Sequence, residues 1–208
     1  ENDSYRVRGG DYIARDYDIE PDVSAACYFY ALAAATGKRA MVKRMRKESL
    51  QGDMKFISLL EKMGCTISWE RDGRQNLWLK GPDGKLKGME VKMSDFSDQA
   101  LTLAAIAPFA DSEVTIKGIA HIRGQESDRI KVIVDELAKM GILCNELPDG
   151  VKIHPGTPKN TNIETYNDHR VAMSFAVTGL AGDGMTILNP MCCKKTFAGF
   201  FDEIDRLE

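Results

Sequence analysis

HIRGQESDR, at residues 121–129, joins a short apolar run at 114–116 to a strong helical pattern at 130–140. The stretch is therefore predicted to be a strand-to-helix connection, with its polar residues gathered at the start of the helix. Glu126 and Arg129 are three residues apart, so they share one helix face. Free backbone amides and the positive end of the helix dipole lie at the same place. One interpretation is an anion site with an acid/base group beside it; the other is an ordinary capped helix with a surface ion pair.

Two further stretches have the same character and lie at predicted helix starts. They read YNDHR at 166–170 and KKTF at 194–197. Together the three stretches resemble the motifs R-x-K-E-[ST]-D-R, N-D-H-R-x-A-M and K-T-[FY]-P of the 5-enolpyruvylshikimate-3-phosphate (EPSP) synthase family, in the same order and spacing. DVSAACYF at 22–29 matches a fourth stretch of that family. Two positions depart from the pattern: Gln125 stands where the family usually has lysine, and Ala198 stands where proline is common.

The composition is ordinary for a soluble globular chain of one or two domains, with 43% hydrophobic and 28% charged residues among 208. The net charge of −3 gives no general attraction to nucleic acid or to an anionic membrane, so any anion site must be local. No apolar run approaches the roughly 20 residues of a membrane span, and no secretion leader is visible. We therefore expect a cytoplasmic protein that binds neither nucleic acid nor membranes.

The cysteines and histidines indicate neither disulfides nor a metal site. The five cysteines are an odd number and contain no C-x-x-C spacing. Three of them, Cys27, Cys65 and Cys144, lie in apolar patterns and are predicted to be buried thiols. The adjacent pair at 192–193 is poorly placed for a normal bridge. The histidines at 121, 154 and 169 have no metal-ligand spacing with the cysteines, so no metal is expected.

An internal repeat is the main feature of the predicted elements. Lys-Met-Gly occurs at 62–64 and again at 139–141, and the predicted helix starts Asp22 and Asp98 are separated by nearly the same distance. Residues 1–20 are predicted to be strands or an extended entry segment. Helices are predicted at 22–35, 53–63, 98–109, 128–140, 168–180 and 196–207, single strands at 40–45, 114–117 and 185–188, and hairpins at 65–80 (turning at Asp72-Gly73) and 142–154 (turning at Asp149-Gly150).

The predicted fold class is α+β, with helices packed inside and sheets outside in an alpha-beta prism. The repeat unit is helix, strand, helix and hairpin, with copies at about 22–96, 97–160 and 161–208, the last lacking its hairpin. A doubly wound sheet is the alternative, but its repeat would contain no antiparallel hairpins. The resemblance implies the same architecture: EPSP synthases have two similar domains of three repeats each. Residues 1–208 would then be a single domain, the C-terminal half, which the extreme N-terminus of the family's chain helps to complete.

Three basic residues at the predicted helix starts point to one anion site. Arg129, Arg170 and Lys195 would converge if the equivalent helix starts meet in a threefold arrangement. With the helix dipoles they would hold a multiply charged anion, such as a phosphate that also bears a carboxylate. For each residue alone, a solvated surface cation is the simpler interpretation. In a chain that supplies only one wall of a cleft, we expect these cations to lie open to solvent.

Acidic residues near the same helix starts are acid/base candidates. Asp98 and Glu126 would exchange protons with a hydroxyl group and a vinyl carbon, which requires carboxyl groups held beside the substrate. Asp98 could equally be a helix cap. Asp168 is predicted to cap its helix or to orient its neighbours, and His169 is either a neutral hydrogen-bonding group or a core histidine.

The resemblance implies a specific reaction without metal or organic cofactor. An enolpyruvyl group moves from phosphoenolpyruvate to the 5-hydroxyl of shikimate 3-phosphate, through a tetrahedral intermediate, and phosphate is released. Carried over by position, Asp98 takes the hydroxyl proton and Glu126 protonates the methylene carbon. The implied phosphoenolpyruvate ligands are Arg129, Arg170 and Lys195, and the implied shikimate 3-phosphate contacts are Asp98, His121 and Gln125.

Three other functions remain open at this point. An enolpyruvyl transferase that acts on a UDP-amino sugar shares the repeat but lacks the paired acidic and basic motifs. A non-catalytic anion-binding or scaffolding domain is suggested by Gln125, because glutamine brings neither charge nor proton. An RNA-end-processing enzyme of similar repeat architecture is disfavoured by the acidic balance and the lack of a basic stripe.

Overall fold

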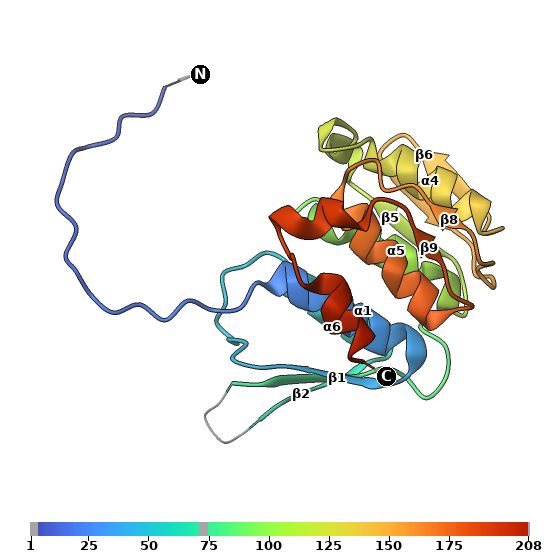
Figure 1. Cartoon of the computed structure of the whole chain (residues 1–208), viewed down its shortest axis with the longest axis horizontal. Helices are drawn as coiled ribbons and strands as arrows, with labels where there is room; N and C mark the ends of the chain where they lie inside the picture. Colours follow the sequence, from blue (N-terminus) through green and yellow to red (C-terminus); the bar gives the residue numbers. More distant parts are fainter. Residues whose placement is uncertain (1–3, 71–74, 208) are drawn as a thin grey trace.

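Three apolar helices lie against one another at the centre of the protein. They are α1 (Val23–Thr36), α3 (Ala100–Ile106) and α5 (His169–Ala181), and each contacts the other two. The computed structural model describes residues 4–70 and 75–207 and is drawn in Figure 1. The central helices are buried on most sides, which explains why their sequences are apolar almost throughout rather than along one stripe.

The strands of the described residues form three sheets outside these helices. The first has the order β1-β3-β2 and is antiparallel, with β1 (Arg39–Val42), β2 (Thr66–Trp69) and β3 (Leu77–Lys80). The second has the order β4-β5-β7-β6, with β4 (Glu90–Lys92), β5 (Val114–Lys117), β6 (Cys144–Leu147) and β7 (Gly150–Ile153). The third pairs β8 (Asn162–Ile163) with β9 (Thr186–Ile187) in parallel.

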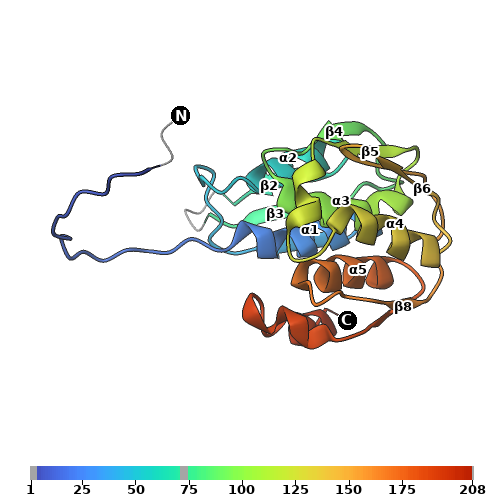
Figure 2. The ribbon, with the colours of Figure 1, turned by 90° about the horizontal axis from the view of Figure 1, so that it is seen from above.

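Each sheet covers one central helix. The strands β1 and β3 contact α1, β5 contacts α3, and β9 contacts α5. Figure 2, turned by 90°, shows the helices between the flanking strands. The protein therefore has α+β content with helices central and sheets peripheral, as the sequence predicts.

The remaining helices are shorter or amphipathic and lie outside the central three. α2 (Met54–Lys62) contacts α1, and α4 (Arg129–Lys139) contacts α3 and the β6–β7 hairpin. The last α-helix is α6 (Phe200–Asp205). Four 3₁₀ segments occur in the described chain: η1 (Ser97–Gln99), η2 (Ala107–Phe109), η3 (Ala120–Gly124) and η4 (Pro190–Lys195).

Most predicted elements are confirmed, with shifted ends. Both hairpins are antiparallel, although the predicted Asp72-Gly73 turn lies outside the described residues. The strand predicted at 40–45 ends at Val42 because Arg44 takes a left-handed φ of 61°, which turns the chain. The short strands β4 and β8 were not predicted, since two or three residues carry no readable alternation.

One predicted element is wrong. The helix predicted at 196–207 is only α6, and Lys195 ends the 3₁₀ segment η4 instead of opening an α-helix. The chain between them is held by Phe197, whose ring packs edge-on against Phe200, and α6 begins only after Gly199. For residues 1–20 the prediction left strands and an extended entry segment open, and the described residues 4–20 adopt the second: they form no strand and extend from the domain in Figure 1, with Asp18 paired to Arg44 and Arg46.

The cysteines are all unbridged. Cys27, Cys65, Cys192 and Cys193 are buried, whereas Cys144, predicted to be buried, is half-buried at the outer strand β6. Within the described ranges, no helix combines the length and apolar character needed to cross a membrane.

Candidate functional site

Six charged side chains meet at one end of the central helices. They come from η1, from the turn before α4, from the first turns of α4 and α5, and from the end of η4. Their contacts, described below, form one continuous network of three cations and three carboxylates: Arg129, Arg170, Lys195, Asp98, Glu126 and Asp168. The formal charges of the network therefore cancel.

A buried ion pair lies at the centre of the network. Arg129 donates to Asp168 through two nitrogens, with Nε–Oδ2 at 2.8 Å and Nη2–Oδ1 at 3.2 Å, and both residues are buried. Asp168 also accepts from Ser127 Oγ at 2.9 Å and from the backbone N–H of Arg170 at 2.9 Å. Burial acts to raise the pKa of Asp168, but the Arg129 guanidinium together with the hydrogen bonds from Arg170 N–H and Ser127 lowers that pKa. Asp168 therefore caps α5, as predicted, and fixes Arg129.

Asp98 lies between two guanidinium groups. Its Oδ2 is 2.8 Å from Arg170 Nη2, and its Oδ1 is 3.4 Å from Arg129 Nη1. Burial acts to lower the pKa of Arg170, but the nearby oxygens of Tyr28, Asp98 and Asp53 together raise it. Asp98 is thus not an N-cap of a helix; it lies inside η1 and joins the two arginines.

Glu126 makes the second bridge between cations. It accepts a hydrogen bond from Lys195 Nζ, and its Oε2 lies 3.7 Å from Arg129 Nη2. The same Oε2 lies 2.9 Å from Nδ1 of His169, although not in a hydrogen-bonding direction. The contact is therefore electrostatic and depends on the protonation state of the imidazole.

We expect His169 to be neutral at pH 7. Burial lowers its pKa below the ordinary value of about 6.5, against the opposing effect of Glu126. Because the unfolded chain binds the proton more readily, stability should be lost as the pH falls from about 6.5 through the lowered pKa of the folded state. An NMR titration of the His169 imidazole in the folded chain measures this pKa; a value at or above the ordinary value of about 6.5 would contradict the prediction.

Gln125 and His121 lie at the edge of the network. Gln125 Oε1 accepts from Arg129 Nη1, and His121 Nε2 lies 2.8 Å from Ser97 Oγ, one residue from Asp98. Both residues are exposed. A lysine at position 125 would add a fourth positive charge beside Arg129, whereas the glutamine adds a neutral acceptor.

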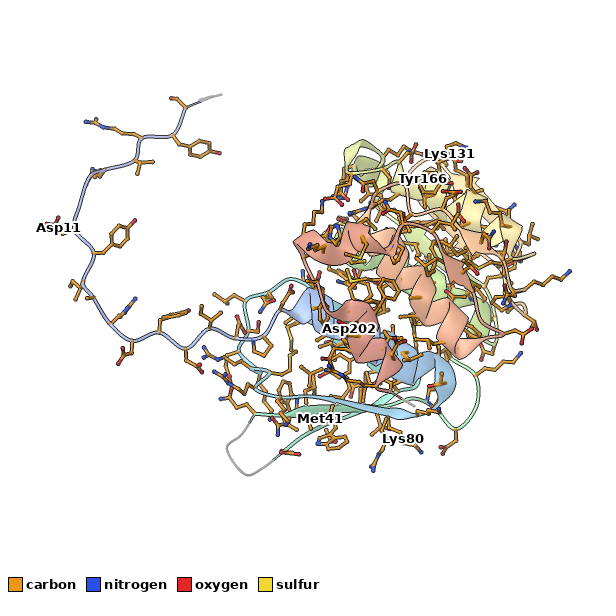
Figure 3. All side chains as sticks on the ribbon, in the orientation of Figure 1. Asp11, Met41, Lys80, Lys131, Tyr166 and Asp202 are labelled. Carbon is orange, nitrogen blue, oxygen red and sulfur yellow. The ribbon has the colours of Figure 1, made fainter. Side chains whose placement is uncertain are left out.

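A strained turn places the start of α5. Tyr166 and Asn167 both have left-handed φ values, 53° and 56°, immediately before Asp168. The Tyr166 hydroxyl donates to the buried Glu136 of α4 at 2.8 Å, and Figure 3 shows Tyr166 beside that helix. Two such residues in succession are unfavourable alone, so the anchoring to α4 maintains the turn.

A second buried network, not predicted, supports Asp98. Asp53 accepts from Gln99 Nε2 at 2.6 Å and from Ser24 Oγ, and it is nearly inaccessible to solvent. Gln99 follows Asp98 directly, so its fixed side chain restrains η1. The sequence signal is the polar Gln99 at the start of a mostly apolar helical run, because Ser24 and Asp53 lie far away in the sequence.

The predicted exposure of the three cations is wrong for two of them. The side chains of Arg129 and Arg170 are only 4% and 13% exposed, whereas that of Lys195 is 53% exposed. The carboxylates explain the difference, because a paired guanidinium can be buried and an unpaired one cannot. An incoming anion must therefore compete with Asp98 and Glu126.

The same carboxylates are poorly suited to a metal ion. Donor atoms of Glu126, Asp168 and His169 lie within 4.8 Å of one another. Arg129 and Lys195 already bind these oxygens, and two cations at contact distance would repel a third. The arrangement is better suited to holding an anionic substrate than a metal.

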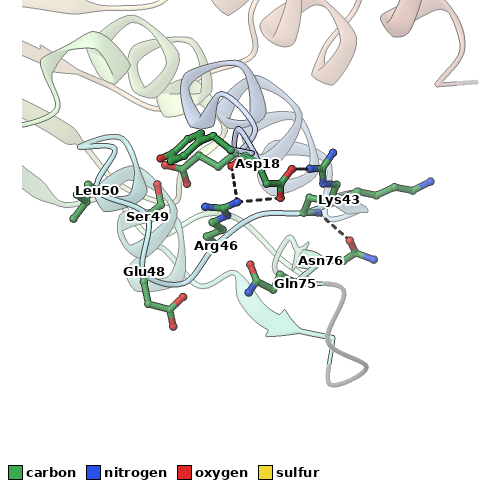
Figure 4. A pocket seen from close by; sticks show the side chains of 11 residues that line it. Asp18, Lys43, Arg46, Glu48, Ser49, Leu50, Gln75 and Asn76 are labelled. Atoms are coloured by element: carbon green, nitrogen blue, oxygen red, sulfur yellow. Dashed lines mark hydrogen bonds and ion pairs between the residues drawn. The ribbon is translucent and has the colours of Figure 1, made fainter. Parts of the chain in front are cut away.

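Two cavities differ in their relation to the charged network. One of about 70 Å³ adjoins Arg170 and His169 at the starts of α1 and α5. A larger one, of about 890 Å³, lies between the N-terminal segment and residues 43–50 (Figure 4). Its lining includes Asp18, Arg44 and Arg46 but no member of the charged network, so its size does not mark the chemistry.

Comparisons with known proteins agree with the motif resemblance. The sequence model of EPSP synthase (3-phosphoshikimate 1-carboxyvinyltransferase) matches residues 1–204. A 3-phosphoshikimate 1-carboxyvinyltransferase of Nostoc punctiforme is 46% identical over 96% of this chain and 46% of its own length. The structure of an EPSP synthase from Acinetobacter baumannii matches with a TM-score of 0.80 at 27% identity, covering 95% of this chain and 48% of that one.

A more distant structure shares the fold alone. The enolpyruvyl transferase NikO from Streptomyces tendae matches with a TM-score of 0.68 at 17% identity, over 91% of this chain and 43% of that one. The chain spans about half the length of the curated relatives it matches. The family model and the relatives confirm the resemblance seen in the motifs, and the chain belongs to the EPSP synthase (3-phosphoshikimate 1-carboxyvinyltransferase) family.

Proposed function

We propose that the protein containing this chain transfers the enolpyruvyl group of phosphoenolpyruvate to the 5-hydroxyl of shikimate 3-phosphate and releases phosphate. The observation that carries the proposal is the network in which two carboxylates, Asp98 and Glu126, lie between three cations. The names of the relatives support the same reaction. The unbridged cysteines support a reducing, cytoplasmic setting.

Phosphoenolpyruvate suits this network because it carries both a phosphate and a carboxylate. Arg129, Arg170 and Lys195 offer bidentate and single donors to those groups. Each donor that turns to the substrate leaves Asp98 or Glu126, since the same nitrogens hold both carboxylates. Substrate binding would thus free the two carboxylates for proton transfer, in a site already buried on the arginine side.

The proposed steps use the freed carboxylates in turn. Asp98 removes the proton of the 5-hydroxyl as the hydroxyl oxygen bonds to C2 of phosphoenolpyruvate. Glu126, which takes up a proton from solvent once Lys195 has turned to the substrate, gives that proton to the methylene carbon. The tetrahedral intermediate then returns a proton from its new methyl group to the Glu126 carboxylate and expels phosphate. His121 and Gln125 face shikimate 3-phosphate, while Asp168 and His169 support the arginines and Glu126. The proposal requires no metal or organic cofactor.

We expect Glu126→Gln to lower kcat by about 10²- to 10⁴-fold, because the amide cannot donate the proton in the transition state. The measurement is phosphate release from phosphoenolpyruvate and shikimate 3-phosphate by the full-length parent protein. Glu146→Gln is the matched control, since Glu146 also pairs with an arginine, Arg123, but lies outside the network. A full rate in Glu126→Gln would remove Glu126 from the mechanism.

The same assay on the wild-type parent protein distinguishes the proposed reaction from the alternative functions. Binding of phosphoenolpyruvate without phosphate release would favour a non-catalytic anion-binding domain. Release only with a UDP-amino sugar as acceptor would favour the other class of enolpyruvyl transferase.

The proposal extends to the whole protein. Residues 1–208 would be one domain, the C-terminal half, and an N-terminal domain of the same chain would form the opposite wall of the cleft. The relatives, about twice as long, support this division.

We also propose three equivalent units at about 22–96, 97–160 and 161–208, supported by the order of central helix and covering sheet. In a crystal structure, α1–β1, α3–β5 and α5–β9 with their connections should superpose under one threefold rotation. Copies related by different rotations would contradict the repeat.

A further inference from the structure

The hydroxyl groups of two buried tyrosines on α1 differ in their hydrogen bonding. The Tyr30 hydroxyl donates to the backbone oxygen of Leu77 at 3.1 Å. Tyr28 is only 2% exposed, and among residues 4–70 and 75–207 its hydroxyl makes no hydrogen bond of good geometry, although it lies close enough to the Arg170 guanidinium to raise the pKa of that arginine. A buried polar group without a partner destabilises the folded state. The Tyr28 hydroxyl therefore needs an explanation other than stability.

The ring of Tyr28 is explained by packing, but the hydroxyl is not. The ring meets Phe200 edge-on, with centroids 5.7 Å apart and planes at 73°. A phenylalanine at position 28 would keep that contact and remove the unpartnered oxygen. The structural role of the side chain thus requires only the ring.

A cavity lies beside this tyrosine. It measures about 70 Å³ and is lined by Tyr28, by His169 and Arg170 at the start of α5, and by Thr196 and Phe197. Such a volume accommodates a few water molecules or one small anionic group. Because Arg170 belongs both to the cavity and to the charged network, the cavity is an extension of the anion site.

Arg170 needs a second acceptor if it is to serve the proposed reaction. In the structure its Nη2 lies 2.8 Å from Oδ2 of Asp98. The proposed function requires Arg170 to turn toward the substrate while Asp98 is freed to act as a base. A guanidinium that leaves its carboxylate in a mostly buried position must donate its remaining hydrogens elsewhere.

We propose that Tyr28 is a positioning residue: its hydroxyl accepts a hydrogen bond from Arg170 when that arginine leaves Asp98 for phosphoenolpyruvate. A neutral acceptor holds the guanidinium in place without competing for its charge, as a carboxylate would. Tyr28 does not touch the substrate; it acts through Arg170. This inference rests on the proposed function.

The test compares Tyr28→Phe with Tyr30→Phe in the full-length parent. Tyr28→Phe should raise the Kd and KM for phosphoenolpyruvate about tenfold or more with kcat nearly unchanged, and should leave the melting temperature unchanged or higher. Tyr30→Phe, which loses a hydrogen bond already made, should show the reverse: a lower melting temperature and an unchanged Kd. Calorimetry measures Kd, phosphate release measures KM and kcat, and thermal unfolding measures stability.

The outcomes separate this inference from the proposed function. If the wild-type parent turns over and Tyr28→Phe has the same Kd and KM as the parent, the role of Tyr28 is overturned and the proposed function stands. A wild-type parent that binds phosphoenolpyruvate but does not turn over overturns the function, and the Kd of Tyr28→Phe still decides the inference. A parent that does not bind phosphoenolpyruvate overturns both.

Discussion

Asp168→Ala is expected to lower the free energy of unfolding of the 208-residue chain by about 3–5 kcal/mol. The reason is the partner left behind: Arg129 is buried and would keep its charge without its bidentate carboxylate. Loss of the cap on the backbone N–H of Arg170 adds to the effect. Urea denaturation followed by circular dichroism measures the change.

Two further variants make this result specific. Asp135→Ala removes an exposed partner of Lys131 at 2.9 Å and should change stability by only about 0.5 kcal/mol or less. Asp168→Ala combined with Arg129→Met should be more stable than Asp168→Ala alone, because no unpaired buried charge remains. A loss of under about 1 kcal/mol in Asp168→Ala would show that Arg129 finds another partner or reaches water.

The isolated chain should fold but turn over at no more than about a thousandth of the rate of the full-length parent. It carries the charged network in a preformed state, so the loss does not arise from disordered catalytic groups. It arises because the proposed opposite domain supplies much of the binding for shikimate 3-phosphate, and because closure of two walls excludes water. The measurement is a coupled phosphate-release assay on both proteins with the two substrates.

Two results of this assay would contradict the expectation, and each has a different cause. Turnover by the isolated chain that approaches the parent's would refute the requirement for a second wall. An inactive parent would point to Gln125, and Gln125→Lys in the parent would then be assayed for recovered phosphate release. Phosphoenolpyruvate binding to the chain alone should be weak, because Asp98 and Glu126 compete for the same cations.

The sequence predicts this fold well where a hydrophobic pattern extends over many residues. The amphipathic pattern of α4 and the apolar runs of α3 and α5 are confirmed to within a few residues. Prediction fails where one backbone angle or one aromatic contact decides the path, as at Arg44 and at Phe197. Such features depend on tertiary packing, which a local pattern does not contain.

The candidate site likewise has features that the sequence predicts and features that it does not. Helix-start motifs predict that Arg129, Arg170 and Lys195 meet, and in the structure they lie in one network. Their low exposure was missed, because the carboxylates that neutralise them come from other parts of the chain. The environment of the Tyr28 hydroxyl could not be predicted from the sequence, since a tyrosine in an apolar helix is predicted to be an ordinary core residue.

The equality of three cations and three carboxylates in the site constrains how the protein can change. Replacing either Arg129 or Asp168 alone leaves the other charge buried without its counterpart, so the effect exceeds the value of the lost contact. Replacements made in opposite-charge pairs, such as Arg129 together with Asp168, avoid that penalty. Divergence of this site, or its redesign for a different anion, is therefore expected to proceed by coupled double substitutions, with the first step of each pair nearly always deleterious.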